Sequence, residues 1–207
     1  MSRLHTAFSR LRSLFGSSPT GKERSLYNLQ ARFNYRFKNT GLLKKALMHK
    51  SAIGGQDPKG LQSNERLEFL GDAVLNCLVT EYLFRHYPDK AEGYLSKIKS
   101  LVVSRKILGE IGAAIDLGRY LTLGISERKS GGQKRKSIIS NAFEAMVGAI
   151  YLDGGLAPVR RSIGPLLLKR IDEFVSDERH VNYKSLILEM SQRDGFGVPQ
   201  YTVLATS

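Results

Sequence analysis

Apolar residues along most of the chain recur at the three- and four-residue spacing of a helix, beginning near Tyr27. Longer segments with this periodicity cover residues 64–87, 95–115, 137–151 and 158–174. Pro88 follows the first segment, and a glycine pair at 154–155 follows the third, so both carry helix stop signals. No alternating pattern typical of a strand precedes residue 198. The pattern therefore predicts an all-α main body over residues 27–175.

The two ends of the chain follow other patterns. Residues 1–26 are basic and serine-rich, which is typical of a basic tail, our preferred interpretation, and also of a transit peptide. After a polar linker at 176–182, the pattern predicts a short helix over 183–193 and one strand over 200–205. One helix and one strand cannot form a stable sheet alone, so residues 183–207 either pack on the main body or begin a truncated second domain.

Net charge gives the first indication of a partner. The chain has 32 Lys and Arg against 19 Asp and Glu, a formal net charge of +13. Such an excess favours a polyanionic partner, either nucleic acid or an anionic membrane surface. We expect no transmembrane helix, because no stretch approaches ~18 consecutive apolar residues. The single cysteine, Cys77, excludes an internal disulfide framework.

The segment 64–75, NERLEFLGDAVL, places three acids on one side of the predicted helix. At about 100° per residue, Glu65, Glu68 and Asp72 fall within about 60° of one another. The other residues are nearly all apolar, so we expect a buried helix with a stripe of carboxylates. Their repulsion and desolvation require a cation, either arginine or a divalent metal. The alternative is a solvated face near the positive end of the helix dipole, which suits Glu65 better than Asp72.

A second apolar segment, residues 137–153, carries Asn141 and Glu144 on one face, three positions apart. Packed against the first helix, it would form a site of oxygen ligands, which suits Mg²⁺ or Mn²⁺ better than zinc. The four histidines lack ligand-like spacing; they are His5, His49, His86 and His180. We expect the isolated His49 to be a structural hydrogen-bonding residue.

The loop predicted at residues 126–136, SERKSGGQKRK, gathers positive charge directly before the second acidic helix. A charge run of this kind is usually a solvated loop, but here it would lie beside the candidate metal site. An anionic substrate next to divalent metals indicates phosphate chemistry. The candidate RNA-binding residues are Arg128, Lys129, Lys134, Arg135 and Lys136.

The sequence NERLEFLGDAVL closely resembles the signature motif of ribonuclease III. Further blocks follow in the order of that family: ALMHKS at 46–51, LGRYLTLGISERKSGG at 117–132 and FEAMVGAIYLDGG at 143–155. The resemblance implies an all-helical nuclease domain that forms a two-fold homodimer in the bacterial cytoplasm. It also implies Mg²⁺-dependent cleavage of double-stranded RNA, with Mn²⁺ as a substitute, in rRNA, mRNA and tRNA processing. Residues 183–207 resemble the beginning of a double-stranded-RNA-binding domain.

The resemblance also assigns roles to particular residues. It implies that Glu68, Asp72 and Glu144 are metal ligands, and that Asp72 and Glu144 are catalytic. Glu65 matches a supporting acidic position near the active centre. Gly71 lies where the signature helix would meet its dimer mate, and its missing side chain would permit close approach.

One position departs from the family pattern, since many members have Asp where this chain has Asn141. An amide oxygen can ligate a hard cation but brings no charge, so we expect Asn141 to remain a ligand in a site with lower metal affinity and retained activity. The alternative is a catalytically impaired, nuclease-like protein that binds double-stranded RNA or the ribosome. A protein that binds an anionic membrane surface is a third possibility, which rests only on net charge and on an apolar stripe at residues 4–15.

Overall fold

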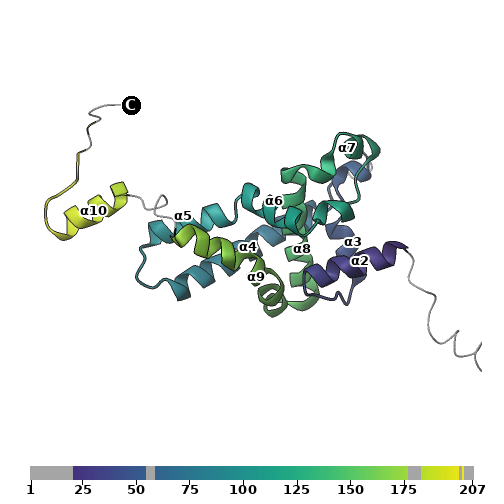
Figure 1. Cartoon of the computed structure of the whole chain (residues 1–207), viewed down its shortest axis with the longest axis horizontal. Coiled ribbons are helices and arrows are strands. Elements are labelled where there is room, and N and C mark those ends of the chain that lie inside the picture. Colours follow the sequence, from purple (N-terminus) through teal and green to yellow (C-terminus); the bar gives the residue numbers. More distant parts are fainter. Residues whose placement is uncertain (1–20, 55–58, 177–182, 201, 203–207) are drawn as a thin grey trace, which may run out of the picture.

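The computed structural model describes residues 21–54, 59–176, 183–200 and 202. No β-strand occurs in these ranges, so the predicted all-α architecture is confirmed (Figure 1). Residues 1–20 of the expected tail (1–26), residues 177–182 of the expected linker (176–182) and nearly all of the strand expected at 200–205 lie outside the described residues. In chain order the elements are α2 (Gly21–Arg32), α3 (Thr40–Ala46), η1 (Lys50–Ala52), α4 (Glu65–His86), α5 (Glu92–Val102), α6 (Arg105–Ala114), η2 (Leu117–Tyr120), α7 (Ile125–Lys129), η3 (Gly132–Lys134), α8 (Lys136–Gly154), α9 (Leu156–Ser176) and α10 (Tyr183–Arg193).

Two predicted boundaries are wrong. The single helix expected over 95–115 is broken into α5 and α6, because the backbone of Ser104 is extended and its side chain caps the amide of Ile107 at 3.4 Å. The segment 126–136 is not a simple loop, since it contains most of α7 and the whole of η3. The first change places the N-terminus of α6 where the prediction had the middle of a helix.

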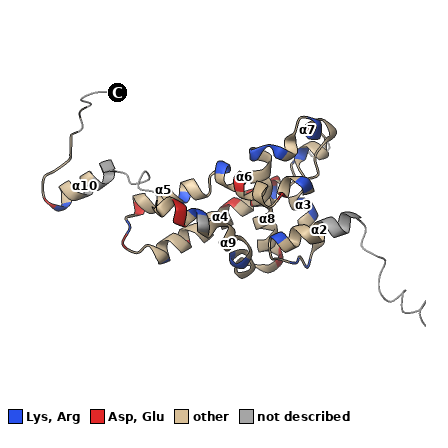
Figure 2. Ribbon diagram, viewed as in Figure 1, with Lys and Arg blue, Asp and Glu red and all other residues tan. Residues whose placement is uncertain are grey.

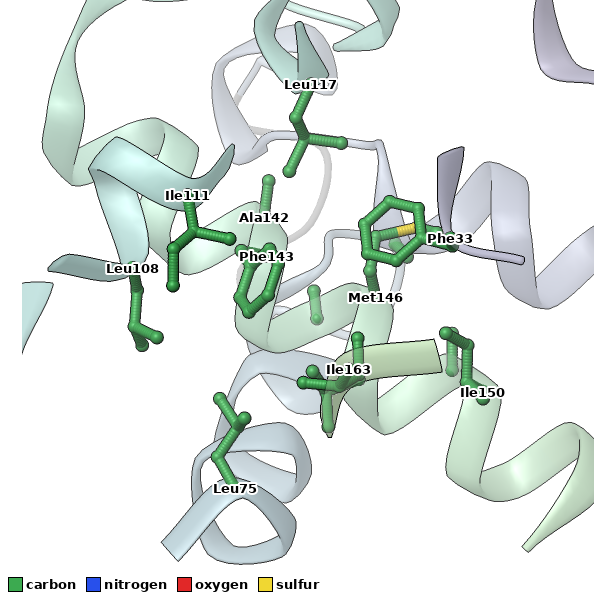
Figure 3. Packing of buried hydrophobic residues seen from close by; sticks show 14 of the residues in the cluster. Phe33, Leu75, Leu108, Ile111, Leu117, Ala142, Phe143, Met146, Ile150 and Ile163 are labelled. Atoms are coloured by element: carbon green, nitrogen blue, oxygen red, sulfur yellow. The ribbon is translucent and has the colours of Figure 1, made fainter. Parts of the chain in front are cut away.

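Helix α8 forms the centre of the hydrophobic core. Its residues from Ala145 to Ile150 are all buried, and burial of this apolar surface is the main favourable contribution to folding. Figure 3 shows Phe143 and Met146 of α8 among side chains from several other elements. The labelled neighbours are Phe33, Leu75, Leu108, Ile111, Leu117 and Ile163.

Helices α4 and α8 cross at two glycines. A Cβ atom on Gly71 would lie 1.7 Å from the backbone oxygen of Glu144, and one on Gly148 would lie 2.3 Å from the backbone oxygen of Leu67. Neither position can hold a side chain unless the helices separate. The interpretation of Gly71 as a point of approach to a dimer mate is therefore wrong, because Gly71 packs against α8 of its own chain.

Helix α4 has one buried and one exposed apolar face, so the prediction of a wholly buried helix is also wrong. Phe69 is 81% exposed and Phe84 is 73% exposed. Between them along the same face, Ala73, Cys77 and Thr80 are exposed as well. In the described parts of the chain, no helix has the length and apolar character that spanning a membrane would require.

Two polar clamps fix the ends of the helices that carry the acids. At the start of α4, the backbone amide of the buried Asn64 donates to Met48 O at 2.8 Å, and its side chain donates to Ala46 O at 3.2 Å. Near the end of α8, Asp153 accepts bonds from the Tyr35 hydroxyl at 2.7 Å and from the amides of Lys38 and Asn39 at 2.8 Å. These long-range bonds hold the ends of α4 and α8 against the α2–α3 region.

Candidate active site

The crossing of α4 and α8 brings the predicted acids together. Glu68 lies in the first turn of α4, Asp72 one turn later, and Glu144 at the closest approach of α8. The three carboxylates interact electrostatically, because the charges of Glu68 and Asp72 both act on Glu144. Two acidic segments separated by about seventy positions in the sequence thus form one cluster.

Glu144 is the most strongly perturbed acid of the cluster. Burial, together with the negative charges of Glu68 and Asp72, raises its pKa from 4.5 to about 7. The positive charge of Arg105 opposes them. Such a raised pKa shows that the surrounding side chains do not neutralise the negative charge that the cluster carries when its carboxyl groups are ionised.

Glu68 shares this environment but has more partners. Burial raises its pKa first, and the charge of Glu65 adds to the rise. A hydrogen bond from the Asn141 side chain opposes them, as do the charges of Lys50 and Arg105. The Asn141 Oδ1 atom accepts a bond from the Ser140 hydroxyl at 3.4 Å. Asn141 therefore lies inside the cluster and holds the carboxylate of Glu68 through its amide group.

Glu65 and Asp72 lie at the edges of the cluster. Glu65 pairs with Lys50 at 3.0 Å and accepts a bond from the Ser63 hydroxyl at 3.3 Å. Asp72 is exposed and accepts a bond from the Asn76 side chain at 3.0 Å. The solvated-face alternative thus suits Asp72 better than the sequence indicated, although its charge still reaches Glu144.

The donor set matches the chemistry of a hard divalent cation. Three carboxylates and an amide provide oxygen ligands, which Mg²⁺ and Mn²⁺ prefer. Among the described residues, no three His, Cys, Asp or Glu side chains converge closely enough to enclose an ion. The acids therefore form an open cluster of neighbours rather than a closed cage.

The predicted basic residues lie in α7, in η3 and at the start of α8, and Figure 2 shows blue segments around the α7 label. Several of them are held by internal contacts. Arg135 pairs with Glu127 at 2.8 Å, and Lys136 pairs with Glu110 at 3.0 Å. The Arg128 guanidinium donates to Leu121 O at 2.9 Å. Lys129 and Lys134 are exposed and make no ion pair within the described part of the chain.

Arg105 is one of two cations acting on the cluster that sequence reasoning missed, and Lys50 is the other. Arg105 is the first residue of α6, and its charge acts on both Glu68 and Glu144. The missed signal is Ser104, a favoured N-cap residue that marks the start of a helix inside the segment expected to be continuous.

His49 has the structural role expected of it. Its Nδ1 atom lies 2.8 Å from the Ser51 hydroxyl oxygen, and burial lowers its pKa. The same hydroxyl accepts a bond from the Gly124 amide at 3.0 Å. His49 thus helps to join the segment before α4 to the segment before α7.

Comparison with known proteins identifies the family. A ribonuclease-III-like family model matches residues 39–171. A ribonuclease 3 from Syntrophotalea carbinolica is 43% identical over 176 residues, which cover 85% of this chain and 76% of that protein. A second ribonuclease 3, from Geobacter sulfurreducens, is 37% identical over 187 residues, covering 90% of this chain and 75% of that protein.

A solved structure agrees with these relatives. It is the nuclease domain of ribonuclease III from Campylobacter jejuni, described as showing structural flexibility in a region involved in dimer formation. The two folds match with a TM-score of 0.63 at 39% sequence identity, over 69% of this chain and 96% of that one. From the helical fold, the acid cluster and these matches together, the chain belongs to the ribonuclease III family of endoribonucleases.

Proposed function

We propose that the chain hydrolyses phosphodiester bonds of double-stranded RNA in a Mg²⁺-dependent reaction that leaves 5′-phosphate and 3′-hydroxyl ends. The observation that carries this proposal is the meeting of Glu68, Asp72 and Glu144 at the crossing of α4 and α8. Clustered, partly buried carboxylates of a positively charged protein suit a divalent cation and a phosphate bound together. We further propose that this cleavage serves rRNA and mRNA processing in the bacterial cytoplasm; the relatives named ribonuclease 3 from bacteria support the proposal that the chain acts in a bacterium.

We assign the metal site to Glu68, Asp72, Asn141 and Glu144, with Glu65 in a supporting position beside Lys50. A divalent ion bound there would supply an activated water nucleophile and would stabilise charge on the leaving oxygen. Glu144 must give up the proton that its raised pKa retains before it can serve as a ligand. The hydrogen bond from Asn141 would orient the carboxylate of Glu68, and it opposes the rise in the pKa of that group that burial and Glu65 cause.

Substrate recognition in this proposal depends on shape and phosphate contacts. The deep, narrow major groove of A-form RNA hides base edges from side chains, so phosphates and 2′-hydroxyl groups dominate binding. The exposed Lys129 and Lys134 are available for such contacts. Arg128, Arg135 and Lys136 would contribute positive potential from the places where their internal contacts hold them.

The exposed apolar face of α4 is the proposed homodimer interface. Phe69 and Phe84 are largely exposed on the same face, and the exposed residues between them are small or weakly polar, so the face forms an apolar strip of the kind that marks an interaction site. A pocket of about 640 Å³ beside Phe69, lined in part by Leu42, Leu70 and Leu152, offers apolar surface to a second copy. A Phe69→Glu variant should elute as a monomer in size-exclusion chromatography, whereas the unchanged chain should elute as a dimer.

The domain organisation follows the same proposal. Residues 27–175 form the nuclease domain, residues 176–182 the linker, and residues 183–207 the beginning of a double-stranded-RNA-binding domain. The extent of the family match, residues 39–171, lies inside the proposed nuclease domain. Helix α10 spans the residues predicted for the first helix of the second domain.

A cleavage assay tests the proposed function. A labelled RNA duplex is incubated with the chain in Mg²⁺ and in EDTA, and Glu144→Ala is compared with Glu173→Ala, which removes an exposed acid from α9. We expect cleavage only with Mg²⁺, and its loss only in Glu144→Ala. Cleavage that persists in Glu144→Ala would refute the assigned site. Duplex binding without any cutting by the unchanged chain would instead support the impaired, RNA-binding alternative.

A further inference from the structure

A pocket of about 300 Å³ lies between α4 and α9, and the proposed cleavage reaction does not use it. Its floor is aliphatic, formed by the core residues Leu78 and Val79 of α4 and Leu167 and Ile171 of α9. Small-molecule sites in proteins have volumes of about 300–1,000 Å³. This α4–α9 pocket is thus large enough for a small organic molecule with an apolar body.

Helix α9 carries two poor helix formers beside the pocket, Gly164 and Pro165. Gly164 lines the α4–α9 pocket, and a Cβ atom on it would contact nothing within 4 Å beyond its own stretch of helix. A larger residue at this position would project into the free space. Gly164 therefore keeps the pocket open where an ordinary helix-forming residue would narrow it.

The rim of the pocket is positively charged. Glu81 bridges two arginines, because its Oε1 atom lies 3.0 Å from Nη2 of Arg85 and its Oε2 atom accepts a hydrogen bond from Nη2 of Arg160. All three side chains line the pocket. Two guanidinium groups and one carboxylate leave one positive charge unbalanced. Each guanidinium has further N–H groups, so both arginines keep donors for another anion.

The pocket is separate from the acid cluster and from the exposed apolar face of α4. It is centred on α4 near Tyr82, about 15 Å further along the helix axis than Asp72. At about 100° per residue, the α4 residues that line it lie on the opposite side of the helix from Phe69 and Phe84. A ligand in the pocket would therefore contact neither the assigned metal ligands nor the proposed dimer interface.

We propose that the α4–α9 pocket binds a small amphipathic anion, namely a carboxylate on an aliphatic chain. The aliphatic floor would cover the chain, and the burial of that apolar surface would favour binding. The carboxylate would lie at the rim, where the remaining donors of Arg85 and Arg160 can form charge-assisted hydrogen bonds with its two oxygens. A single negative charge matches the one positive charge that Glu81 leaves unbalanced. This inference goes beyond the proposed cleavage reaction and does not depend on it.

A titration followed by amide NMR tests the proposal, with octanoate as the probe and without RNA or metal. Octanol has the same chain without charge, octylammonium has the same chain with a positive charge, and acetate has the negative charge without the chain. We expect octanoate to bind with a dissociation constant of about 0.5 mM and to shift the amide signals around Gly164. Octanol should bind about tenfold more weakly, because it lacks the charge-assisted bonds. Octylammonium and acetate should bind more weakly still.

Three substitutions test where octanoate binds. Gly164→Leu should abolish binding by filling the pocket, whereas Gly93→Leu, at an open position of α5, should not change it. Arg160→Gln should weaken binding about tenfold. Its control, Arg161→Gln, removes the same charge from the next residue of α9, which is exposed, and should have little effect. Glu81→Gln should strengthen binding about threefold, because a carboxylate that repels the ligand is removed.

The direction of the Glu81→Gln effect separates a ligand site from a structural bridge. If Glu81 only ties α4 to α9, its removal would loosen the pocket and weaken binding. Weaker binding in Glu81→Gln, equal affinities for octanoate and octanol, or unchanged binding in Arg160→Gln would overturn the proposal, as would unchanged binding in a folded Gly164→Leu variant. Absence of octanoate binding by the unchanged chain would overturn it as well. Because the titration contains neither RNA nor metal, such a failure leaves the proposed cleavage function unaffected.

Discussion

Replacement of Glu144 by glutamine tests whether the acid cluster carries uncompensated charge. Burial and the charges of Glu68 and Asp72 raise the pKa of Glu144 from 4.5 to about 7. In metal-free protein the folded state therefore retains a proton that the unfolded state releases as pH rises above 4.5. Stability must fall as pH increases from about 4.5 to about 7, because the unfolded state binds fewer protons there.

The size of this effect follows from the pKa difference. A change from 4.5 to about 7 corresponds to about 3 kcal/mol, at about 1.4 kcal/mol for each tenfold change in proton affinity. Glu144 is only partly shielded from water, so we expect about half of that, ~1.5 kcal/mol, after solvent screening. Glutamine has nearly the same shape and no charge, so Glu144→Gln should recover this energy at pH 8.

Thermal unfolding in EDTA measures the prediction. At pH 8 we expect Glu144→Gln to melt about 4 °C higher than the unchanged chain, on the scale of about 3 °C per kcal/mol for a protein of this size. At pH 5 the gain should shrink to a small remainder. Glu173→Gln, an exposed acid on α9, should give no comparable gain. Added Mn²⁺ should reverse the order, because ion binding stabilises only the chain that retains the carboxylate.

Two results would contradict this reasoning. An equal gain at pH 5 and pH 8 would show that the variant improves packing instead of relieving charge. A variant less stable than the unchanged chain at pH 8 would show that Glu144 is already neutralised by a partner. Either result would remove the main electrostatic reason for expecting a metal ion at the cluster.

Three further substitutions test the structure around the site. Gly71→Ala should lower the free energy of unfolding in urea by about 3 kcal/mol, because its Cβ would overlap the α8 backbone; Gly93→Ala, with no atom nearby, should not. Asp153→Asn should cost about 2 kcal/mol in the same assay, because a charged acceptor of three bonds is weakened. Asn141→Asp should shift cleavage activity to lower Mg²⁺ concentration, and superimposable Mg²⁺ titrations would refute a role for the missing charge.

Sequence periodicity predicted the helices and the acid stripe because both are local properties. Residues three or four positions apart share a helix face in any fold, so the grouping of Glu65, Glu68 and Asp72 required no tertiary information. The pairing with Glu144 followed only from the assumption that the two acidic helices pack together. The structure supplies the reason for that packing, namely the glycine contact between α4 and α8.

The remaining features depend on contacts that periodicity cannot show. Residues 95–115 keep a continuous apolar stripe, so the break at Ser104, and with it the place of Arg105, is invisible to a helical pattern. An apolar face that binds a partner has the same composition as one that faces the core, so the apolar pattern predicted a buried helix where the structure leaves Phe69 exposed. The prediction for Gly71 was wrong for a related reason. A glycine indicates that another helix approaches closely, but the sequence does not show whether that helix belongs to the same chain or to a dimer mate.

The distribution of positive charge around the site also depends on tertiary contacts. Lys136 is paired with Glu110, and Arg135 is paired with Glu127. The number of cations free to contact RNA near the acids is therefore smaller than the net charge of +13 indicates. Exposed ion pairs of this kind stabilise the fold little, but they determine where positive charge is held. The salt dependence of duplex binding depends on the number of phosphates neutralised. We therefore expect removal of Lys129 or Lys134 to reduce the slope of affinity against salt concentration by about one phosphate contact each. Removal of Lys136 should change that slope less, because Lys136 is paired with Glu110 and makes no direct phosphate contact in this proposal. The released Glu110 would repel the RNA.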